Sequence, residues 1–353
     1  MTPHPPPSVD ESSPRQTGSA VEFLAIAEAG LLEAQALLLC ESIRRFGGAH
    51  AAAAITIVSP RPSRRPSPAS RRRFDRLGVE FVAADLASPF PEYGTSFRVA
   101  AAAHIARRPG APILVQLDSD TLFLGQPDFA LRDVDFAARP VDVKGICTCG
   151  DGDPNDAYWR RVSAACDVDY AAIGWVTTTV DAQRVRANYN GGLIATRRSS
   201  GVFERTEEIF LRIVRDRLVS HTRPPSPLRI GAGEVSPDGY TYWGTSQMAL
   251  SLACTALGAR VQILPADYNV PLHYFDQLGA RAAAPVHVHY HWLADADQLA
   301  SSPLVDGRMA LPAAQARWLR SRLPLDQART PGFAARLRRV LSAERFTRML
   351  RAR

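Results

Sequence analysis

The segment ILVQLDSDTLFL, residues 113–124, is an apolar strand that runs directly into two carboxylates one residue apart. In an open α/β sheet the ligand crevice lies at the carboxyl ends of the strands, where Asp118 and Asp120 would fall. Hard oxygen ligands suit Mg²⁺ or Mn²⁺, and an ion held by few carboxylates keeps positions free for substrate phosphates. The alternative is that the pair caps the strand-to-turn junction, since Asp is common where a backbone bends.

Strand-like and helix-like segments alternate on the N-terminal side of this motif. Strands separated by helices imply right-handed crossovers and a parallel sheet with both faces covered. We therefore predict an α/β fold with a mostly parallel central sheet and flanking helices. The predicted strands are 21–30, 53–60, 79–85 and 112–120, then 133–141, 176–180, 189–195, 261–270 and 285–293; the main predicted helices are 31–46, 95–108, 202–218 and 246–256.

Composition divides the chain into three parts. Residues 1–20 are rich in Pro and Ser with little to bury, so we predict disorder there. Residues 21–303 form the predicted domain, and residues 304–353 a basic helical extension. From residue 312 to the end, eleven arginines face two acidic residues, a net charge of +9 where the whole chain carries +7. Such a stretch can lie on anionic lipid, or it can pack on the domain with a solvated basic face.

Several classes of protein are excluded by composition. No apolar run reaches the roughly 18 residues needed to cross a bilayer, and the N-terminus lacks a basic-then-apolar signal pattern. We therefore expect a cytoplasmic protein, with peripheral contact to the inner membrane face through the basic extension as a further hypothesis. No nucleic acid is expected as a partner, because no aromatic-interleaved basic groove accompanies the arginines.

Histidines alternate with other residues in a late strand-like segment. His287, His289 and His291 would share one face of a strand, with Val288 and Tyr290 on the other. Neutral imidazole binds Mn²⁺ alongside carboxylates and also favours zinc, although a single histidine is more often a core residue. This segment is the last of three motifs that follow the paired carboxylates: NYNGGLIATRR (188–198), LPADYNV (264–270) and VHVHYHW (286–292).

With these four motifs in order, the chain resembles the metal-dependent glycosyltransferases of the GT-A fold, specifically the retaining glycogenin-like and galactosyltransferase-like group, over roughly residues 21–293. The resemblance implies transfer of a sugar from a nucleotide-sugar donor, with a UDP-sugar favoured. The acceptor, whether glycan, lipid or small molecule, is not identified. The resemblance also implies that Asp118, Asp120 and His289 hold a Mn²⁺ or Mg²⁺ ion that bridges the two donor phosphates.

Other donor contacts are implied by the same resemblance. Arg98, on the helix before the motif strand, would pair with the diphosphate; the competing interpretation is a solvated surface arginine. Glycine lets a backbone or a flat sugar approach closely, although a glycine pair can also mark a simple turn or bulge. The expected donor-binding set is Ala27 and Glu28 toward the nucleoside, Arg98, Asp118, Ser119 and Asp120 toward the diphosphate, and Asn190, Gly191 and Gly192 under the sugar.

One position departs from the pattern of the family. Relatives usually carry Asp or Glu before the Gln of the helix that follows the sugar-binding strand, and this chain has Ser246 before Gln247. Either Gln247 makes the contact with the sugar, or Asp238 or Glu234 on the preceding loop does. With Arg98, we therefore name Gln247 and Asp238 as the expected catalytic residues.

Two other functions compete with a transferase. A haloacid-dehalogenase-like phosphohydrolase uses the first Asp of Asp-x-Asp-Gly-Thr as a nucleophile, but here Thr121 follows Asp120 directly and three strands precede the motif. A non-catalytic sugar-nucleotide-binding module is the second alternative, because fold does not fix function.

Overall fold

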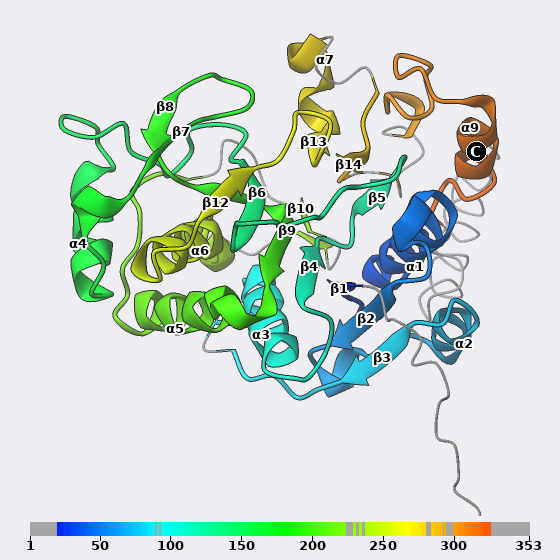
Figure 1. Ribbon diagram of the computed structural model, residues 1–353, viewed down its shortest axis with the longest axis horizontal. Coiled ribbons are helices and arrows are strands. Elements are labelled where there is room, and N and C mark those ends of the chain that lie inside the picture. Colours follow the sequence, from blue (N-terminus) through cyan, green and yellow to red (C-terminus); the bar gives the residue numbers. More distant parts are fainter. Residues whose placement is uncertain are drawn as a thin grey trace, which may run out of the picture.

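A seven-stranded sheet in the order β12-β6-β9-β4-β1-β2-β3 forms the centre of the molecule (Figure 1). Strand β9 runs antiparallel to β4 and β6, and the other neighbours are parallel, so the predicted α/β class with a mostly parallel sheet is confirmed. The strands are β1 Val21–Ile26, β2 Ala54–Ser59, β3 Glu80–Ala83, β4 Ile113–Leu117, β6 Phe136–Pro140, β9 Tyr189–Arg197 and β12 Val261–Ile263. The computed structural model describes residues 20–88, 90–91, 93–223, 229–230, 233–234, 237–279, 284–291, 293 and 299–325.

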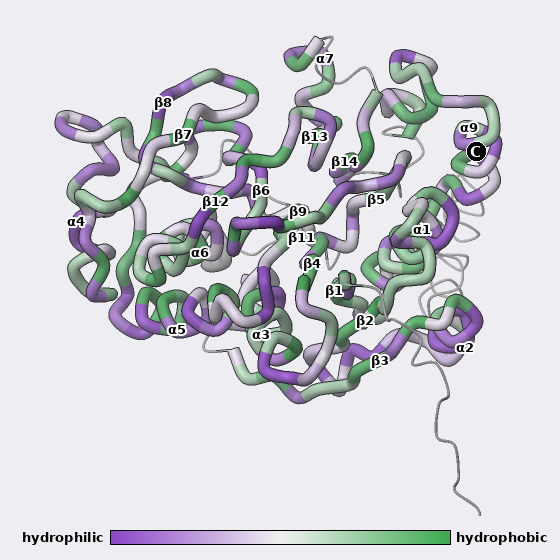
Figure 2. Tube along the Cα trace, in the orientation of Figure 1, coloured by the Kyte–Doolittle hydropathy of each residue, from purple (hydrophilic) through white to green (hydrophobic). Residues whose placement is uncertain are grey.

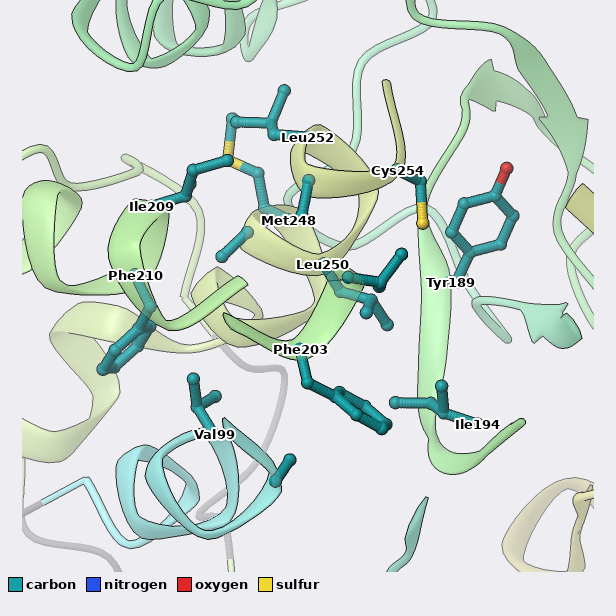
Figure 3. Close-up of a cluster of buried hydrophobic side chains, with 14 of the residues drawn as sticks. Val99, Tyr189, Ile194, Phe203, Ile209, Phe210, Met248, Leu250, Leu252 and Cys254 are labelled. Atoms are coloured by element: carbon teal, nitrogen blue, oxygen red, sulfur yellow. The ribbon is translucent and has the colours of Figure 1, made fainter. Parts of the chain in front are cut away.

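Helices cover both faces of this sheet. Alternate residues of a strand point to opposite faces, and Val115 of β4 accordingly packs in one apolar cluster with α1, whereas Leu114 packs in another with α3, α5 and α6. Figure 3 shows the second cluster, which includes Phe203 and Phe210 of α5 and Met248 of α6. The helices are α1 Leu31–Phe46, α2 Pro68–Arg76, α3 Thr95–Ala106, α4 Asp156–Ala165, α5 Val202–Arg215, α6 Thr245–Ala256, α7 Phe275–Leu278 and α9 Ala313–Arg320.

Helix α5 shows why the sequence pattern predicted these elements well. Its buried residues, which include Val202, Thr206, Ile209 and Ile213, recur at helical spacing, and α5 alternates between hydrophobic and hydrophilic positions in Figure 2. The interior position of β9 agrees with its apolar run Leu193–Ala195, because eight of its nine residues are buried and strands covered on both faces are rich in apolar residues.

A second, three-stranded sheet decides where the late histidines lie. It has the order β13-β14-β5, with β13 Val270–Pro271, β14 His287–His289 and β5 Thr121–Phe123. Strand β5 follows β4 after the turn at Ser119 and Asp120, and β14 pairs antiparallel with it so that His289 lies opposite Thr121. The second sheet therefore joins the last motif of the sequence to the first.

Two predicted strands are wrong in extent. The segment 261–270 is not one strand, because β12 pairs with β6 in the central sheet and β13 pairs with β14 in the other. Pro265 follows the first of these strands and cannot donate to a sheet ladder. Among the described residues of the segment 285–293, only β14 is regular, and His291 has a positive φ of 54°. His291 therefore lies outside the strand alternation from which a shared face was predicted.

Several short elements were not predicted. Helix α4 follows the polar loop at 150–155, and β8 Arg184–Arg186 forms a hairpin with β7 Trp175–Thr177. Strand β7 itself corresponds to the predicted strand at 176–180 but begins one residue earlier and ends at Thr177. A second small hairpin pairs β10 Arg229–Ile230 with β11 Gly233–Glu234.

The described part of the C-terminal extension packs on the domain. Trp318 and Leu319 of α9 are buried in one apolar cluster with Leu38 of α1, and the rings of Trp318 and Phe46 are 5.1 Å apart. The predicted disorder of residues 1–19 and the predicted membrane contact of residues 326–353 lie outside the described residues, so the division into three parts stays a prediction. Within the part of the chain that is described, no helix is long and apolar enough to cross a bilayer.

Candidate active site

A cavity of about 440 Å³ opens where the carboxyl ends of β1, β4 and β6 meet. Glu28 follows β1, Asp118 follows β4 and Asp142 follows β6, and all three line the cavity. These three strands run in the same direction because β9, between β4 and β6, is antiparallel to both. The location agrees with the crevice expected at the carboxyl edge of an open sheet.

Arg98 of α3 lines this cavity and joins three separate elements. Its Nη1 donates to Oδ1 and Oδ2 of Asp118, at 2.9 and 3.1 Å, and to the carbonyl of Gly191 at 2.7 Å. Its Nη2 donates to the hydroxyl of Ser246 at 3.2 Å. The side chain is 13% exposed, so the interpretation of Arg98 as a solvated surface residue is wrong.

Asp120 is held between two histidines. Its Oδ1 lies 3.1 Å from Nε2 of His289, and its Oδ2 lies 3.3 Å from Nδ1 of His291. One ligand atom from each of the three residues falls within 4.8 Å of the others, an arrangement able to hold a metal ion. Asp118 is more distant, with its Oδ2 3.9 Å from Nε2 of His289.

The carboxylates of the motif do not serve the turn. Those of Asp118 and Asp120 meet side chains from α3 and from the end of β14, whereas the turn is tied by the hydroxyl of Thr121, which donates to the carbonyl of Asp118 at 2.7 Å. The structure therefore disfavours the capping interpretation.

Electrostatics couple these groups closely. Burial alone would raise the pKa of Asp120, but His289 and His291 outweigh burial and hold that pKa well below its usual range. Burial opposes a charged His289, yet the nearby carboxylates, Asp120 foremost, raise its pKa. Burial and the neighbouring His289 lower the pKa of His291. The charged form of the His289 imidazole is thus stabilised, whereas the neutral form of the His291 imidazole is favoured.

The Asn190–Gly191–Gly192 segment lies inside β9 rather than at a turn before a strand. A Cβ on Gly191 would lie 2.2 Å from Nη1 of Arg98, and one on Gly192 would lie 2.7 Å from Nδ1 of His289. Glycine is thus needed because two functional side chains rest against the backbone. The turn interpretation is wrong, whereas a bulge is present, because the pairing of β6 with β9 shifts register between Ala138↔Ile194 and Pro140↔Tyr189, across this segment. Asn190 is fixed in place, since its Oδ1 accepts from the amide of Gly192 at 2.9 Å.

The predicted nucleoside end is formed by the turn after β1. Glu28 is buried and accepts from Nε of Arg61 at 2.6 Å and again from Nη2. Ala27 is fully buried, and its amide donates to the carbonyl of Val58 at 3.0 Å. The hydroxyl of Ser119 donates to the carbonyl of Ile26 at 2.5 Å. Glu28, predicted to face the nucleoside, and Ser119, predicted to face the diphosphate, both line the cavity, whereas Ala27 supports the turn through its backbone.

Ser246, at the start of α6, is the position where the sequence departs from the family pattern. Ser246 meets Arg98 at the position where the resembling family carries a carboxylate, and Gln247 lines the cavity beside it. The backbone of Asp238 belongs to a 3-10 helix at Pro237–Tyr242, and that of Glu234 to β11. The side chains of Asp238 and Glu234 lie outside the described residues, so the choice among the three candidates stays a prediction.

Sequence reasoning missed Asp142. Its carboxylate accepts from Nδ2 of Asn190 at 2.8 Å and from the hydroxyl of Thr179 at 2.9 Å, and burial raises its pKa to about 6. The signal was present, because Asp142 follows a strand just as Asp118 does. That strand could be placed beside the site only once the strand order was known.

Solved glycosyltransferase structures resemble this one distantly. An active-site mutant of LgtC is 11% identical, with 86% of this chain and 96% of that chain covered and a TM-score of 0.48. The bifunctional WbbM is 13% identical, with 90% of this chain covered and a TM-score of 0.47; the matched region spans about half of WbbM, 51%. Core-mannan synthase A of Aspergillus fumigatus, in a Mn/GDP form, is 10% identical, with 75% and 80% covered and a TM-score of 0.45.

Comparison of the sequence with models of protein families identifies one family. A family model described as a Rhodobacterales glycosyltransferase domain matches residues 23–225, more than half of the chain. No curated protein matches the sequence significantly. The matched region contains Arg98, Asp118, Asp120 and the glycines of β9 but ends before β14.

Proposed function

This chain belongs to the Rhodobacterales glycosyltransferase domain family, and on that premise we propose that it transfers a hexosyl group from a nucleoside-diphosphate sugar, a UDP-sugar being favoured, to an acceptor hydroxyl. The observation that carries the proposal is the cavity at the carboxyl edge of the sheet, with Arg98, Asp120 and His289 together on its lining. Its volume of about 440 Å³ is in the usual range of roughly 300–1,000 Å³ for small-molecule sites.

A divalent ion, Mn²⁺ or Mg²⁺, fits the residues present. Asp120 and His289 would hold it, with Asp118 adjacent, because carboxylate oxygen and imidazole nitrogen already face one another at 3.1 Å. When bound, such an ion supplies charge stabilisation to a departing diphosphate. The two positions expected from the motif, Asp118 and Asp120, thus differ in role: one meets Arg98 and the other meets the histidines.

Arg98 would provide a fixed positive charge for the leaving group. Its guanidinium is oriented by the Gly191 carbonyl and the Asp118 carboxylate before any substrate arrives. Preorganised donors of this kind stabilise developing charge without reorganisation at the moment of reaction. Sharing Arg98 with an incoming diphosphate would weaken its bonds to Asp118.

The sugar would lie over the Asn190–Gly191–Gly192 segment, beside Asp142 and Gln247. Asn190 donates to the Asp142 carboxylate at 2.8 Å, and burial raises the pKa of this carboxyl group on the cavity lining despite that hydrogen bond. Gln247 lines the same cavity and offers an amide to a sugar hydroxyl. No protein nucleophile is assigned, and the proposal leaves open whether the acceptor is a glycan, a lipid or a small molecule.

The contacts of Asp118 also weigh against a phosphohydrolase. That chemistry needs the first carboxylate of the motif as a free nucleophile, whereas both oxygens of Asp118 accept hydrogen bonds from Arg98. A non-catalytic binding module would use the same cavity, so only turnover separates it from a transferase.

A thermal-shift screen tests the proposal. UDP-, GDP-, ADP- and TDP-sugars are compared with and without Mn²⁺, because a ligand present at a hundred times its dissociation constant stabilises the folded state by about 2.7 kcal/mol. We expect the largest shift with a UDP-sugar and Mn²⁺ together, accompanied by slow release of UDP. Binding without any donor hydrolysis or transfer would support the binding module, and cleavage of phosphomonoesters instead would refute the transferase.

A further inference from the structure

His291 stands next to the residues expected to hold the divalent ion. We propose that His291 is itself a metal ligand, so that Asp120, His289 and His291 form a nitrogen-rich set that binds a transition-metal dication such as Mn²⁺ or Co²⁺ in preference to Mg²⁺. This inference rests on the proposed function, because the same ion would serve the donor diphosphate.

The distances suit one shared ion. Asp120 Oδ1 is 3.1 Å from Nε2 of His289, and Asp120 Oδ2 is 3.3 Å from Nδ1 of His291. Two ligands that each lie about 2.1 Å from a metal are about 3.0–3.4 Å apart in octahedral or tetrahedral geometry. One ligand atom from each of Asp120, His289 and His291 lies within 4.8 Å of the other two. A common ion therefore requires only small side-chain movements.

The backbone directs His291 toward this site. Strand β14 ends at His289, and the amide of Tyr290 then donates to the carbonyl of Asp120 at 3.0 Å. His291 follows with a φ of 54°, a left-handed conformation uncommon for a residue other than glycine. Such conformations cluster at functional sites, where the surrounding structure compensates for their cost. Here the result is an imidazole that faces Asp120 although the strand alternation has ended.

Ring packing holds both imidazoles in place. The ring centroids of His289 and His291 are 3.8 Å apart, and His273 packs edge-on against His291 at 4.5 Å. The side chain of His289 is 9% exposed and that of His291 is 24% exposed, so both still reach the cavity that they line. Among the described residues, His273 lies outside the group of ligand atoms that fall within 4.8 Å of one another, and its ring contacts His291 as a packing partner.

Asp118 is less well placed than His291 to complete the set. Arg98 occupies both of its oxygens, and the nearer one is 3.9 Å from Nε2 of His289. The donors available to the ion are therefore two imidazole nitrogens and one carboxylate. Mg²⁺ prefers oxygen ligands and retains its waters, whereas imidazole favours first-row transition metals.

Metal binding by the full-length, metal-free protein tests this assignment without an activity assay. Affinities for Mn²⁺, Co²⁺ and Mg²⁺ are measured calorimetrically for wild type, His291→Asn and His291→Ala; asparagine suits the positive φ, and alanine removes every donor atom. Because even outer-sphere partners alter metal affinity about 10- to 100-fold, we expect both variants to weaken Mn²⁺ and Co²⁺ binding at least tenfold. Mg²⁺ binding should change much less.

Two controls make the result specific. His273→Phe keeps a ring against His291 but removes its nitrogens, and it should bind Mn²⁺ within about twofold of wild type. The visible absorption bands of bound Co²⁺ should change in the His291 variants and remain unchanged in His273→Phe. Thermal unfolding of the metal-free variants checks that each one is folded.

Wild-type Mn²⁺ affinity and an unchanged Co²⁺ spectrum in both His291 variants would overturn the inference, as would a wild-type preference for Mg²⁺. If His289→Asn then still lost the ion, the metal site of the proposed function would stand without His291. Normal metal binding by a protein that turns over no sugar donor would refute the proposed function and leave the ligand assignment intact.

Discussion

Arg98 donates two hydrogen bonds from Nη1 to the carboxylate of Asp118, and the same guanidinium contacts the carbonyl of Gly191 and the hydroxyl of Ser246. The first carboxylate of the motif is therefore neutralised by the protein itself. The second, Asp120, faces His289 and His291 and is the better placed of the two to receive a cation. An Asp-x-Asp motif can thus divide its two side chains between anchoring a cationic residue and binding a metal.

The Arg98–Asp118 pair should contribute to stability. Side chains that are 13% and 26% exposed leave a partly buried charge unpaired when either is removed. We expect Arg98→Met and Asp118→Asn each to lower the free energy of unfolding by about 1–3 kcal/mol, and the double variant to lose less than the sum. Urea denaturation of the metal-free protein measures all three. The exposed pair Arg108–Glu80 is the control, with an expected coupling of no more than about 0.5 kcal/mol; additive losses at Arg98 and Asp118 would contradict the prediction.

The glycines of β9 should resist substitution for different reasons. In Gly191→Ala the new methyl group would displace Arg98, and in Gly192→Ala it would displace His289 and Asn269. A shift of about 1 Å at a catalytic group can cost roughly a hundredfold in rate. We expect losses of that order in donor turnover, with weaker Mn²⁺ binding in Gly192→Ala only. Gly174→Ala, where an added Cβ meets no atom within 4 Å, should leave both quantities unchanged; equal Mn²⁺ affinities in all three variants would contradict the expectation for Gly192.

Metal binding should depend on pH through His289. Its pKa is raised above the ordinary 6.5 by the carboxylates around it, Asp120 foremost, despite burial, and the pKa of Asp120 is lowered below 3.8. In the metal-free protein, the pairing of His289 with Asp120 stabilises the fold at pH values between the pKa of Asp120 and the pKa of His289. This stabilisation is lost as pH rises through the pKa of His289 or falls through that of Asp120. A metal must displace the proton from His289, so Mn²⁺ affinity should rise with pH.

Thermal shifts induced by Mn²⁺ measure this dependence directly. The shift should be larger at pH 8 than at pH 6, and calorimetry in buffers of different ionisation enthalpy should detect proton release on binding. Asp120→Asn should abolish most of the shift at both pH values. Equal shifts at pH 6 and pH 8 in the wild type would show that His289 is not protonated before the metal binds.

Restoring a carboxylate at position 246 should strengthen metal binding. In Ser246→Asp the added charge would compete with Asp118 for Arg98 and would free an Asp118 oxygen for the ion. The substitution suits the first turn of α6, where negative charge is favourable. We expect Mn²⁺ affinity to rise severalfold by calorimetry, whereas Ser246→Ala should change it by less than about twofold. A fall in affinity in Ser246→Asp would show that Asp118 has no access to the ion.

Much of the framework was predictable from local patterns. The helix predicted at 31–46 is α1, and the motif strand is β4 with Asp118 directly after it. Burial periodicity and the glycines that follow α1 are encoded within a few residues, so no tertiary information was needed. The predicted strand at 261–270 failed because its two ends pair with strands in different sheets.

The sequence by itself determined the order of helices and strands, the position of the paired carboxylates at a strand end, and the nearby residue types able to bind phosphate and metal. Tertiary structure alone decided which of them are partners. The antiparallel insertion of β9 brings Gly191 to Arg98, and the pairing of β14 with β5 brings His289 and His291 to Asp120. These contacts join residues up to about 170 positions apart. Their geometry depends on which strands become neighbours, because strand pairing is long-range whereas periodicity is local.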